Sequence, residues 1–370
     1  MIERILPVGN SRSVGLISIL VFATWIGCSK DSTNPAEGGA SGSPSRILSI
    51  SPSPRQDPPA TSQDILAAID LAYNSGARGQ HLNTTWRGLE PSPGAFALTD
   101  AANILTYLGT LRGFKIQVVL SVLNTNVRET PADLMSTAFD SPQMKTRFHA
   151  LLDAMLPLLN PNVVYLSIGN EVDAYLSLHP TEWSAYKSFF QDAVGYLHQR
   201  APSLKLGVTT TFAGASGIDS LNVRGLNDSS DVFILTYYPI GTQFVPRQPS
   251  VADAEIAQMV SLARGRPLIL QEVGYPAATS LTSSELAQAQ FVTAVFSAWQ
   301  SHGTTIPFLN FFCMHDFTHT QCDSLAQYYG SPNSQPFKDY LGSLGFRAVN
   351  GTPKPAWQAF VDSAARVTKR

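Results

Sequence analysis

Two stretches of the chain decide the fold: residues 162–171, NVVYLSIGNE, and residues 267–272, PLILQE. Each contains a continuous run of Val, Ile and Leu, which is typical of a strand covered on both faces in a parallel sheet. Each ends in a glutamate, Glu171 or Glu272. A barrel of alternating strands and helices carries its functional residues at the carboxyl ends of its strands. The two stretches therefore predict two carboxylates at the mouth of one barrel.

The rest of the chain repeats this pattern of strand and helix. Apolar runs alternate with helical patterns from residue 46 onward, which indicates βα units and a parallel sheet. Strands are expected at 46–50, 77–85, 115–123, 162–168, 205–211, 231–237, 267–270 and 308–313, and helices at 63–75, 101–112, 143–159, 182–200 and 285–300. Eight strands favour an α/β fold, a single (β/α)8 TIM barrel over residues 46–370. Glu171 then closes strand four and Glu272 closes strand seven, on facing sides of the mouth.

Composition limits the partners of the chain. It has 370 residues, 44% of them hydrophobic, so a large core can be buried in one barrel. The net charge is −2 and only 14% of residues are charged. Without a basic stripe, nucleic acid is not an expected partner.

The N-terminus predicts export. An apolar run at 14–27 is too short to span a bilayer and is typical of a secretory signal. The residues just before and including Cys28 (WIGC) resemble a bacterial lipobox, which implies cleavage before Cys28 and lipidation of that cysteine. Residues 29–45 are rich in Ser, Gly and Pro and would form a flexible tether. The alternative is an ordinary export signal with an incidental cysteine.

These features predict three parts: a lipoprotein signal peptide at 1–28, a tether at 29–45 and the barrel domain at 46–370. The expected location is the bacterial cell envelope, at the outer membrane or cell surface, or outside the cell if Cys28 is not lipidated. Contact with a membrane would be through the lipid anchor alone. The domain is expected to be a monomer.

Five short motifs stand out along the chain: 168–172 (IGNEV), 236–239 (TYYP), 272–276 (EVGYP), Trp86 with 90–96 (EPSPGAF), and 350–357 (NGTPKPAW). They resemble motifs of the clan A retaining glycoside hydrolases, a superfamily of (β/α)8 barrels. The first three are similar to segments of the endo-β-1,4-galactanase and endo-β-1,3-glucanase families. The resemblance runs from about residue 46 to residue 360 and implies hydrolysis of a β-glycosidic bond.

The chain departs from the clan pattern at two strands. Strand six often carries His-x-Tyr in the clan, and Thr236 stands at the histidine position here. A tryptophan often ends strand eight, where this chain has Phe311, Phe312 and Met314. These departures concern the sugar more than the reaction type.

The resemblance assigns roles to the two glutamates. Glu171 would be the general acid/base and Glu272 the nucleophile that forms a covalent glycosyl-enzyme intermediate, with retention of anomeric configuration. Their carboxyls would lie about 5 to 5.5 Å apart. Coupling across that distance would keep Glu171 protonated near neutral pH. The alternative is that each glutamate caps a helix or forms an ion pair at the rim.

Two neighbours of the glutamates are expected to assist. Asn170 would hydrogen-bond the sugar 2-hydroxyl, unless it only forms a turn after Gly169. Tyr238 would hold Glu272 through its hydroxyl, while Tyr237 would point elsewhere because strand neighbours alternate faces. A core role for the tyrosine is the alternative.

Three further residues are candidates for sugar binding. Trp86 offers an indole ring that matches the apolar face of a pyranose, although packing in the core explains it equally well. Asn83 and Asn124 lie near the ends of strands two and three, where they would bind hydroxyls or simply form loops.

The sequence thus predicts a retaining glycosidase that cleaves a polysaccharide or oligosaccharide, with endo action suggested by the galactanase-like and glucanase-like segments. Two carboxylates suffice for the reaction, so no cofactor and no metal are expected. One rival is a surface glycan-binding lipoprotein that keeps the barrel without turnover. The other is a metal-assisted hydrolase that uses His315 and His319. Cys313 and Cys322 are expected either to form a disulfide or to remain free thiols.

Overall fold

A computed structural model describes residues 46–368 of the chain. The predicted signal peptide, Cys28 and the tether at 29–45 lie outside the described residues. Among the residues that are described, no helix has both the length and the hydropathy that a membrane span requires.

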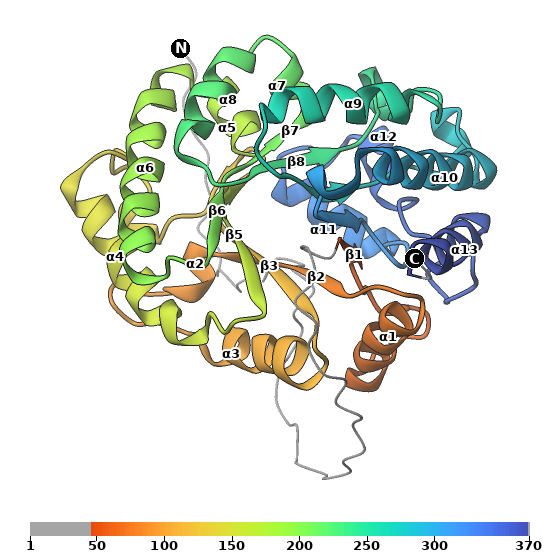
Figure 1. Ribbon diagram of the computed structural model, residues 1–370, viewed down its shortest axis with the longest axis horizontal. Coiled ribbons are helices and arrows are strands. Elements are labelled where there is room, and N and C mark those ends of the chain that lie inside the picture. The colour runs from red at the N-terminus through yellow and green to blue at the C-terminus, as the bar shows by residue number, and fades with distance from the viewer. Residues whose placement is uncertain (1–45, 369–370) are drawn as a thin grey trace, which may run out of the picture.

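One sheet curves into a barrel with its strands running in parallel (Figure 1). Its strands are β1 (Ile47–Ile50), β2 (Gly79–Thr85), β3 (Lys115–Asn124), β4 (Val127–Arg128), β5 (Val163–Asn170), β6 (Lys205–Gly207), β7 (Thr209–Thr211), β8 (Phe233–Tyr237), β9 (Leu268–Val273) and β10 (Phe308–Phe311). Their order is β6-β5-β3-β2-β1-β10-β9-β8-β7, with β4 added antiparallel to β3. Because only Val208 separates β6 from β7, the two ends of this path meet and close the barrel.

The predicted single (β/α)8 barrel is confirmed. Each of the eight predicted strands is present, and β6 and β7 together occupy the fifth position. Several boundaries differ by a few residues, and one of these differences concerns the site: β9 continues to Val273, so Glu272 lies inside the strand and not beyond its end.

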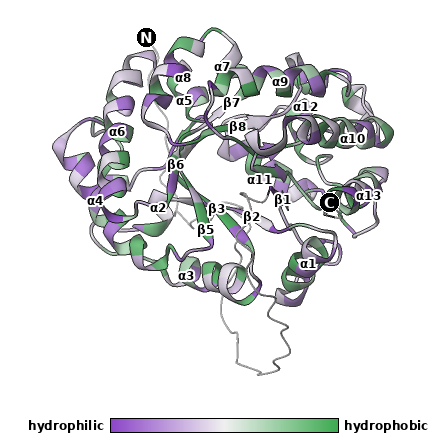
Figure 2. Cartoon of the chain, in the orientation of Figure 1, coloured by the Kyte–Doolittle hydropathy of each residue, from purple (hydrophilic) through white to green (hydrophobic). Residues whose placement is uncertain are grey.

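Helices accompany the strands, and most of them cover the outer side of the barrel (Figure 1). They are α1 (Ser62–Asn74), α2 (Trp86–Leu89), α3 (Thr99–Leu105), α4 (Pro142–Met155), α5 (Val172–Leu178), α6 (Trp183–Arg200), α7 (Phe212–Ser216), α8 (Ser220–Leu226), α9 (Val251–Ala263), α10 (Glu285–His302), α11 (His319–Tyr328), α12 (Gln335–Leu341) and α13 (Pro355–Thr368). The five predicted helices correspond to α1, α3, α4, α6 and α10. The helices carry hydrophobic residues among hydrophilic ones in Figure 2, as expected of helices with one buried face.

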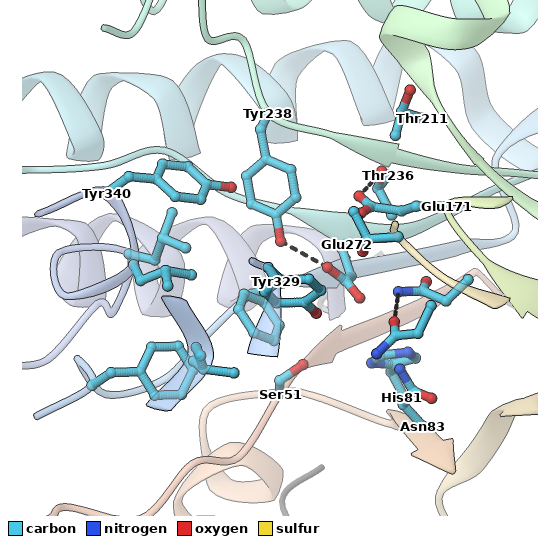
Figure 3. A pocket seen from close by; sticks show the side chains of 18 of the residues that line it. Ser51, His81, Asn83, Glu171, Thr211, Thr236, Tyr238, Glu272, Tyr329 and Tyr340 are labelled. Atoms are coloured by element: carbon cyan, nitrogen blue, oxygen red, sulfur yellow. Dashed lines mark hydrogen bonds between the residues drawn. The ribbon is translucent and has the colours of Figure 1, made fainter. Parts of the chain in front are cut away.

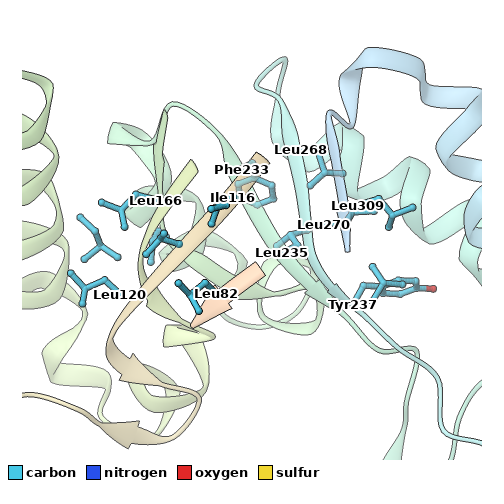
Figure 4. Packing of buried hydrophobic residues seen from close by; sticks show 14 of the residues in the cluster. Leu82, Ile116, Leu120, Leu166, Phe233, Leu235, Tyr237, Leu268, Leu270 and Leu309 are labelled. Atoms are coloured by element: carbon cyan, nitrogen blue, oxygen red, sulfur yellow. The ribbon is translucent and has the colours of Figure 1, made fainter. Parts of the chain in front are cut away.

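The main core lies between the strands and the helices. Outward side chains of the strands, such as Leu120, Leu166, Leu235 and Leu270, are fully buried there (Figure 4). Strand neighbours alternate faces, so every second residue points into the barrel instead. The outer face therefore anchors the strands while the inner face is free to carry chemistry.

The barrel interior changes from apolar to polar toward the mouth. At the amino end, Ile47, Ile234, Ile269 and Phe308 form a small buried cluster. Gly79 leaves room for it, because a Cβ at that position would lie 2.5 Å from the Ile47 side chain. Further along the strands the buried inward side chains are polar: Gln117, Ser167, Thr209, Gln271 and Asn310. Polar groups that need partners are thus gathered below the predicted site.

Candidate active site

Glu171 is placed by a sharp turn at the end of β5. Gly169 has φ +96°, and a Cβ there would lie 2.4 Å from the Tyr186 hydroxyl, so glycine is required. Glu171 itself has φ +47° in the left-handed region and directly precedes α5. Although it stands at the N-cap position, its side chain makes no capping hydrogen bond. The carboxylate is turned toward the pocket instead (Figure 3).

Two threonine hydroxyls hold the Glu171 carboxylate. Thr236 Oγ1 donates to Oε1 at 2.6 Å, and Thr125 Oγ1 donates to Oε2 at 2.8 Å. Thr125 has φ +54°, which is unusual for a β-branched residue. Strained backbone of this kind concentrates at functional sites. Thr125 and Glu171 both have a positive φ, and a hydrogen bond joins their side chains.

Glu272 is linked to Glu171 through a residue of β8, the strand next to β9. Thr236 on β8 is in register with Glu272 on β9, and the Thr236 hydroxyl contacts Glu171 (Figure 3). Tyr238 Oη donates to Glu272 Oε2 at 2.8 Å. Within the described residues neither glutamate forms an ion pair. The alternative roles, helix cap and rim ion pair, are therefore not what these side chains do.

The environment of the pair favours one shared proton. Burial and, after it, the negative charge of Glu171 together raise the pKa of Glu272 from its ordinary value of 4.5 to about 8. The sequence predicted that the coupling would hold the proton on Glu171, whereas the structure shows the raised pKa at Glu272. Two carboxyls that interact this strongly titrate as a pair, so one proton is shared between them until a bound substrate favours one of the two positions.

The two tyrosines at the end of β8 point in opposite directions. Tyr238 faces the pocket and binds Glu272, and burial together with the negative charge of Glu272 raises the pKa of Tyr238. Tyr237 is fully buried on the outer face, where its hydroxyl donates to Glu255 Oε2 at 2.6 Å. The pair has the arrangement that strand alternation predicts.

Asn170 is fixed by a network of amides. Its Oδ1 accepts from Gln271 Nε2 at 2.7 Å, and its Nδ2 donates to Asn124 Oδ1 at 2.9 Å. Gln271 Oε1 in turn accepts from Gln117 Nε2 at 2.8 Å and Thr209 Oγ1 at 2.5 Å. An amide nitrogen has two N–H groups, so Asn170 can still present one to a ligand. Asn170 lines the pocket, as a role in binding the 2-hydroxyl requires.

Asn83 and Asn124 also line the pocket. Asn83 Oδ1 accepts from Ser121 Oγ at 2.8 Å, and Asn124 is buried between Asn170 and Tyr328. Both amides are therefore held in one orientation close to the glutamates. Their binding of sugar hydroxyls stays a prediction.

Trp86 does not line the pocket, and the expectation that it stacks on a sugar is wrong. Thr85 caps α2, which turns Trp86 away from the mouth and into the helical layer. The indole is fully buried against Phe148 and Phe189, and its Nε1 donates to Glu90 Oε2 at 2.7 Å. The motif is structural, since Glu90 also binds Arg147.

A long segment between β10 and α13, residues 312–354, covers one side of the mouth. We call it the cap segment. Asn124 Nδ2 donates to Tyr328 Oη at 3.1 Å, and Tyr328 Oη donates to Glu129 Oε1 at 2.5 Å. Asn126 Nδ2 donates to the Tyr329 carbonyl at 3.0 Å. Because β1 and β2 lie between β10 and β3, the cap segment crosses above them.

The cap segment adds aromatic residues that sequence reasoning missed. Tyr329 and Tyr340 lie in the pocket near the glutamates (Figure 3). Tyr340 packs on Tyr238 with ring centroids 5.7 Å apart and on Phe244 at 5.2 Å, and Phe244 packs on Phe337 at 5.1 Å. This row of aromatic rings begins at Tyr238, whose hydroxyl binds Glu272. The only sequence signal for it is the density of aromatic residues in a long loop after the last strand.

The pocket has a volume of about 620 Å³. Among the described residues that line it, Glu171 and Glu272 are the only acidic ones and none is Lys or Arg. His81 also lines it, and burial lowers its pKa to about 4, so that it is neutral at physiological pH. The site thus offers hydroxyls, amides and rings around two carboxylates.

His315 has a structural role. Its Nδ1 lies 2.6 Å from the Ser53 carbonyl and therefore carries the proton, while its Nε2 accepts from Arg347 Nε at 3.2 Å. Burial lowers its pKa to about 4. With both ring nitrogens engaged, His315 is not placed to bind a metal together with His319. Cys313 and Cys322 are buried free thiols, so of the two alternatives the structure has the unbonded one.

No protein-family model matches the chain, and no curated protein matches it. Solved structures do. A GH5_18 protein from Streptomyces cattleya in complex with GlcNAc is 18% identical, with a TM-score of 0.70 over 88% of this chain and 81% of that one. The exo-beta-1,4-mannosidase Op5Man5 from Opitutaceae bacterium strain TAV5 is 17% identical, with a TM-score of 0.69 over 88% and 60%.

A family 39 glycoside hydrolase from Bacteroides cellulosilyticus WH2 is 14% identical, with a TM-score of 0.60 over 87% of this chain and 64% of that one. The chain has their barrel fold. Identities this low establish the fold and not the reaction. Evidence for the reaction therefore has to come from the side chains in the pocket of this chain.

Proposed function

We propose that the protein is a retaining β-glycosidase. The observation that carries this is the pair of carboxylates, Glu171 directly after β5 and Glu272 on β9, which line one pocket and both lie next to Thr236. A retaining pair is closer together than an inverting pair, because no water has to fit between sugar and nucleophile. The fold shared with glycoside hydrolases supports the assignment.

The proposal gives each glutamate one role. Tyr238 holds Glu272 Oε2, so Oε1 attacks the anomeric carbon as the bond to the leaving oxygen breaks. Glu171 gives its proton to that oxygen, and the aglycone departs as an alcohol. Water then attacks the same carbon, Glu171 takes the proton of that water, and Glu272 is released. Asn170 holds the 2-hydroxyl during both steps.

The pocket favours a neutral substrate. Without a Lys or Arg among its described lining residues, it has no counter-ion for a uronate, sulfate or phosphate group. The cap segment closes the side above β1 and β2, which favours release of a terminal sugar over the internal cleavage that the sequence motifs predicted. Product analysis on a neutral β-glucan or mannan distinguishes single sugars from a ladder of fragments.

The test is sugar release from a panel of β-galactans, β-glucans, mannans and xylans and from the corresponding aryl β-glycosides. Wild type is expected to release sugar from at least one, and Glu272→Gln to lose more than about 10³-fold in kcat. Glu285→Gln, an exposed glutamate on α10, is the control. Binding without turnover would support the glycan-binding rival, and activity that survives in Glu272→Gln would overturn the nucleophile.

We also propose that Cys28 anchors the protein to the cell envelope by a lipid. The supporting evidence is the lipobox-like WIGC segment and the Ser/Gly/Pro stretch that follows it. In a bacterial host, metabolic labelling with a fatty acid is expected to mark wild type and not Cys28→Ala. Equal labelling of both, or labelling of neither, would contradict the anchor.

A further inference from the structure

An apolar shelf lies beside the proposed general acid. Helix α5 begins directly after Glu171, and Ala174 and Leu178 on that helix line the pocket. Phe212 and Ala213 at the start of α7 line it next to them. We call these four residues the shelf. Every side chain in the shelf is a hydrocarbon, whereas the nearby ends of β2, β3 and β8 present amides and hydroxyls.

The shelf is open to solvent at Leu178 and Ala213, above the buried Phe212, and continues outward. Leu178 is 67% exposed, which is a high value for a leucine at the rim of a pocket. Ser177 Oγ donates to Asp219 Oδ2 at 2.6 Å, which brings the 99% exposed Ile218 to the same edge. Large exposed apolar side chains that adjoin a cleft mark binding surfaces.

Hydrogen bonds between α5 and the start of α7 hold the shelf in a fixed position. Asp173 on α5 accepts from Thr211 N at 2.8 Å and from Thr211 Oγ1 at 2.6 Å, which ties α5 to the start of α7. A Cβ at Gly214 would lie 2.1 Å from the Asp173 carboxylate, so the two helices approach as closely as glycine allows. The apolar surface is therefore preformed.

From this arrangement we infer that the substrate is a β-glycoside with an apolar aglycone, such as an alkyl chain. The inference rests on the proposed function, in which Glu171 protonates the leaving oxygen. The group attached to that oxygen must leave past the residues beside Glu171, and on the side of α5 and α7 those residues are the shelf. A sugar ring placed there would lose water from its hydroxyls without finding partners, which costs free energy, while an alkyl chain buries apolar area.

Binding tests this without turnover. Calorimetry on Glu272→Gln compares methyl and octyl β-D-glucosides and β-D-mannosides below micelle concentration. The octyl glycoside of at least one sugar is expected to bind about tenfold more tightly than the methyl glycoside. Adding Leu178→Ser should remove most of that difference. Adding Leu111→Ser, equally exposed at 67% but before β3 at the far end of the barrel, should not.

Three results would overturn the inference: equal binding of octyl and methyl glycosides, a chain-length preference that survives Leu178→Ser, or tighter binding of cellobiose or mannobiose than of the octyl glycosides. The last result would assign the shelf to a second sugar. Failure of the proposed function is a separate outcome, in which octyl glycosides bind at the shelf and wild type does not hydrolyse them.

Discussion

The strand ends and the cap segment form opposite walls of one pocket, and they are built in different ways. Glu171 and Glu272 stand at the ends of strands of one rigid parallel sheet, where strand register and the contact with Thr236 fix them. The cap segment is a long excursion after the last strand that reaches β3 through Tyr328 and Asn126. In the proposed reaction the first wall supplies the reacting groups, whereas the second limits what can enter. Changes to the first should lower kcat, and changes to the second should alter KM.

After Glu272→Gln, the largest effect is expected from Glu171→Gln. Losing the general acid should lower kcat by about 10² to 10⁴-fold for an alkyl glycoside, whose leaving group needs a proton. A dinitrophenyl glycoside needs none, so its glycosylation rate should fall far less. Steady-state and burst kinetics on both substrates measure this. An equal loss on the two would show that Glu171 is not the acid.

Next comes Tyr238→Phe. Removing the hydroxyl that orients Glu272 should lower kcat by about 10- to 100-fold and shift the acidic limb of the pH profile, with KM little changed. Tyr237→Phe is the matched control, because that hydroxyl binds Glu255 on the outer face. Similar kinetics for the two variants would mean that the contact between Tyr238 and Glu272 has no part in the reaction.

A smaller effect is expected in the cap segment. Tyr328→Phe removes the contacts to Asn124 and Glu129 that hold the cap segment on β3. KM should rise by roughly two- to tenfold while kcat stays within about twofold, since each such bond contributes modestly. A fall in kcat with unchanged KM would show that the two walls are not separate in function.

The smallest effect is on stability and depends on pH. Because the folded pKa of Glu272 is raised to about 8, the folded state binds this proton more tightly than the unfolded state. The resulting destabilisation is absent below about pH 4.5 and complete above about pH 8. Glu272→Gln should therefore raise the Tm by a few degrees at pH 8 and hardly at pH 4. A Tm difference between Glu272→Gln and wild type that is independent of pH would contradict the raised pKa.

The contrast between the strand ends and the cap segment also explains which features of the molecule can be predicted from the sequence. Continuous Val and Ile runs and the Asn-Glu and Gln-Glu ends place eight strands and both glutamates, because parallel strands bring their carboxyl ends together. Alternation along β8 also separates Tyr238 from Tyr237. These inferences depend on patterns that span only a few neighbouring residues, and such local patterns can be read from a single sequence.

Long-range contacts are not recorded in that way. Nothing near Trp86 shows that Thr85 starts a helix and buries the indole beneath Phe148 and Phe189. Likewise, the contact from Tyr328 to Asn124 joins residues 204 positions apart across two strands. The residues that shape the pocket on the cap side follow from this packing and not from local pattern.

The most direct test of the two-glutamate account is to trap the intermediate. Wild type would be incubated with 2,4-dinitrophenyl 2-deoxy-2-fluoro-β-D-glucoside and the corresponding mannoside, digested and analysed by mass spectrometry. We predict one fluoroglycosyl group per chain, esterified to Glu272, with slow release on dilution. An adduct on Glu171 or elsewhere, or turnover to an inverted product with no adduct, would contradict the account.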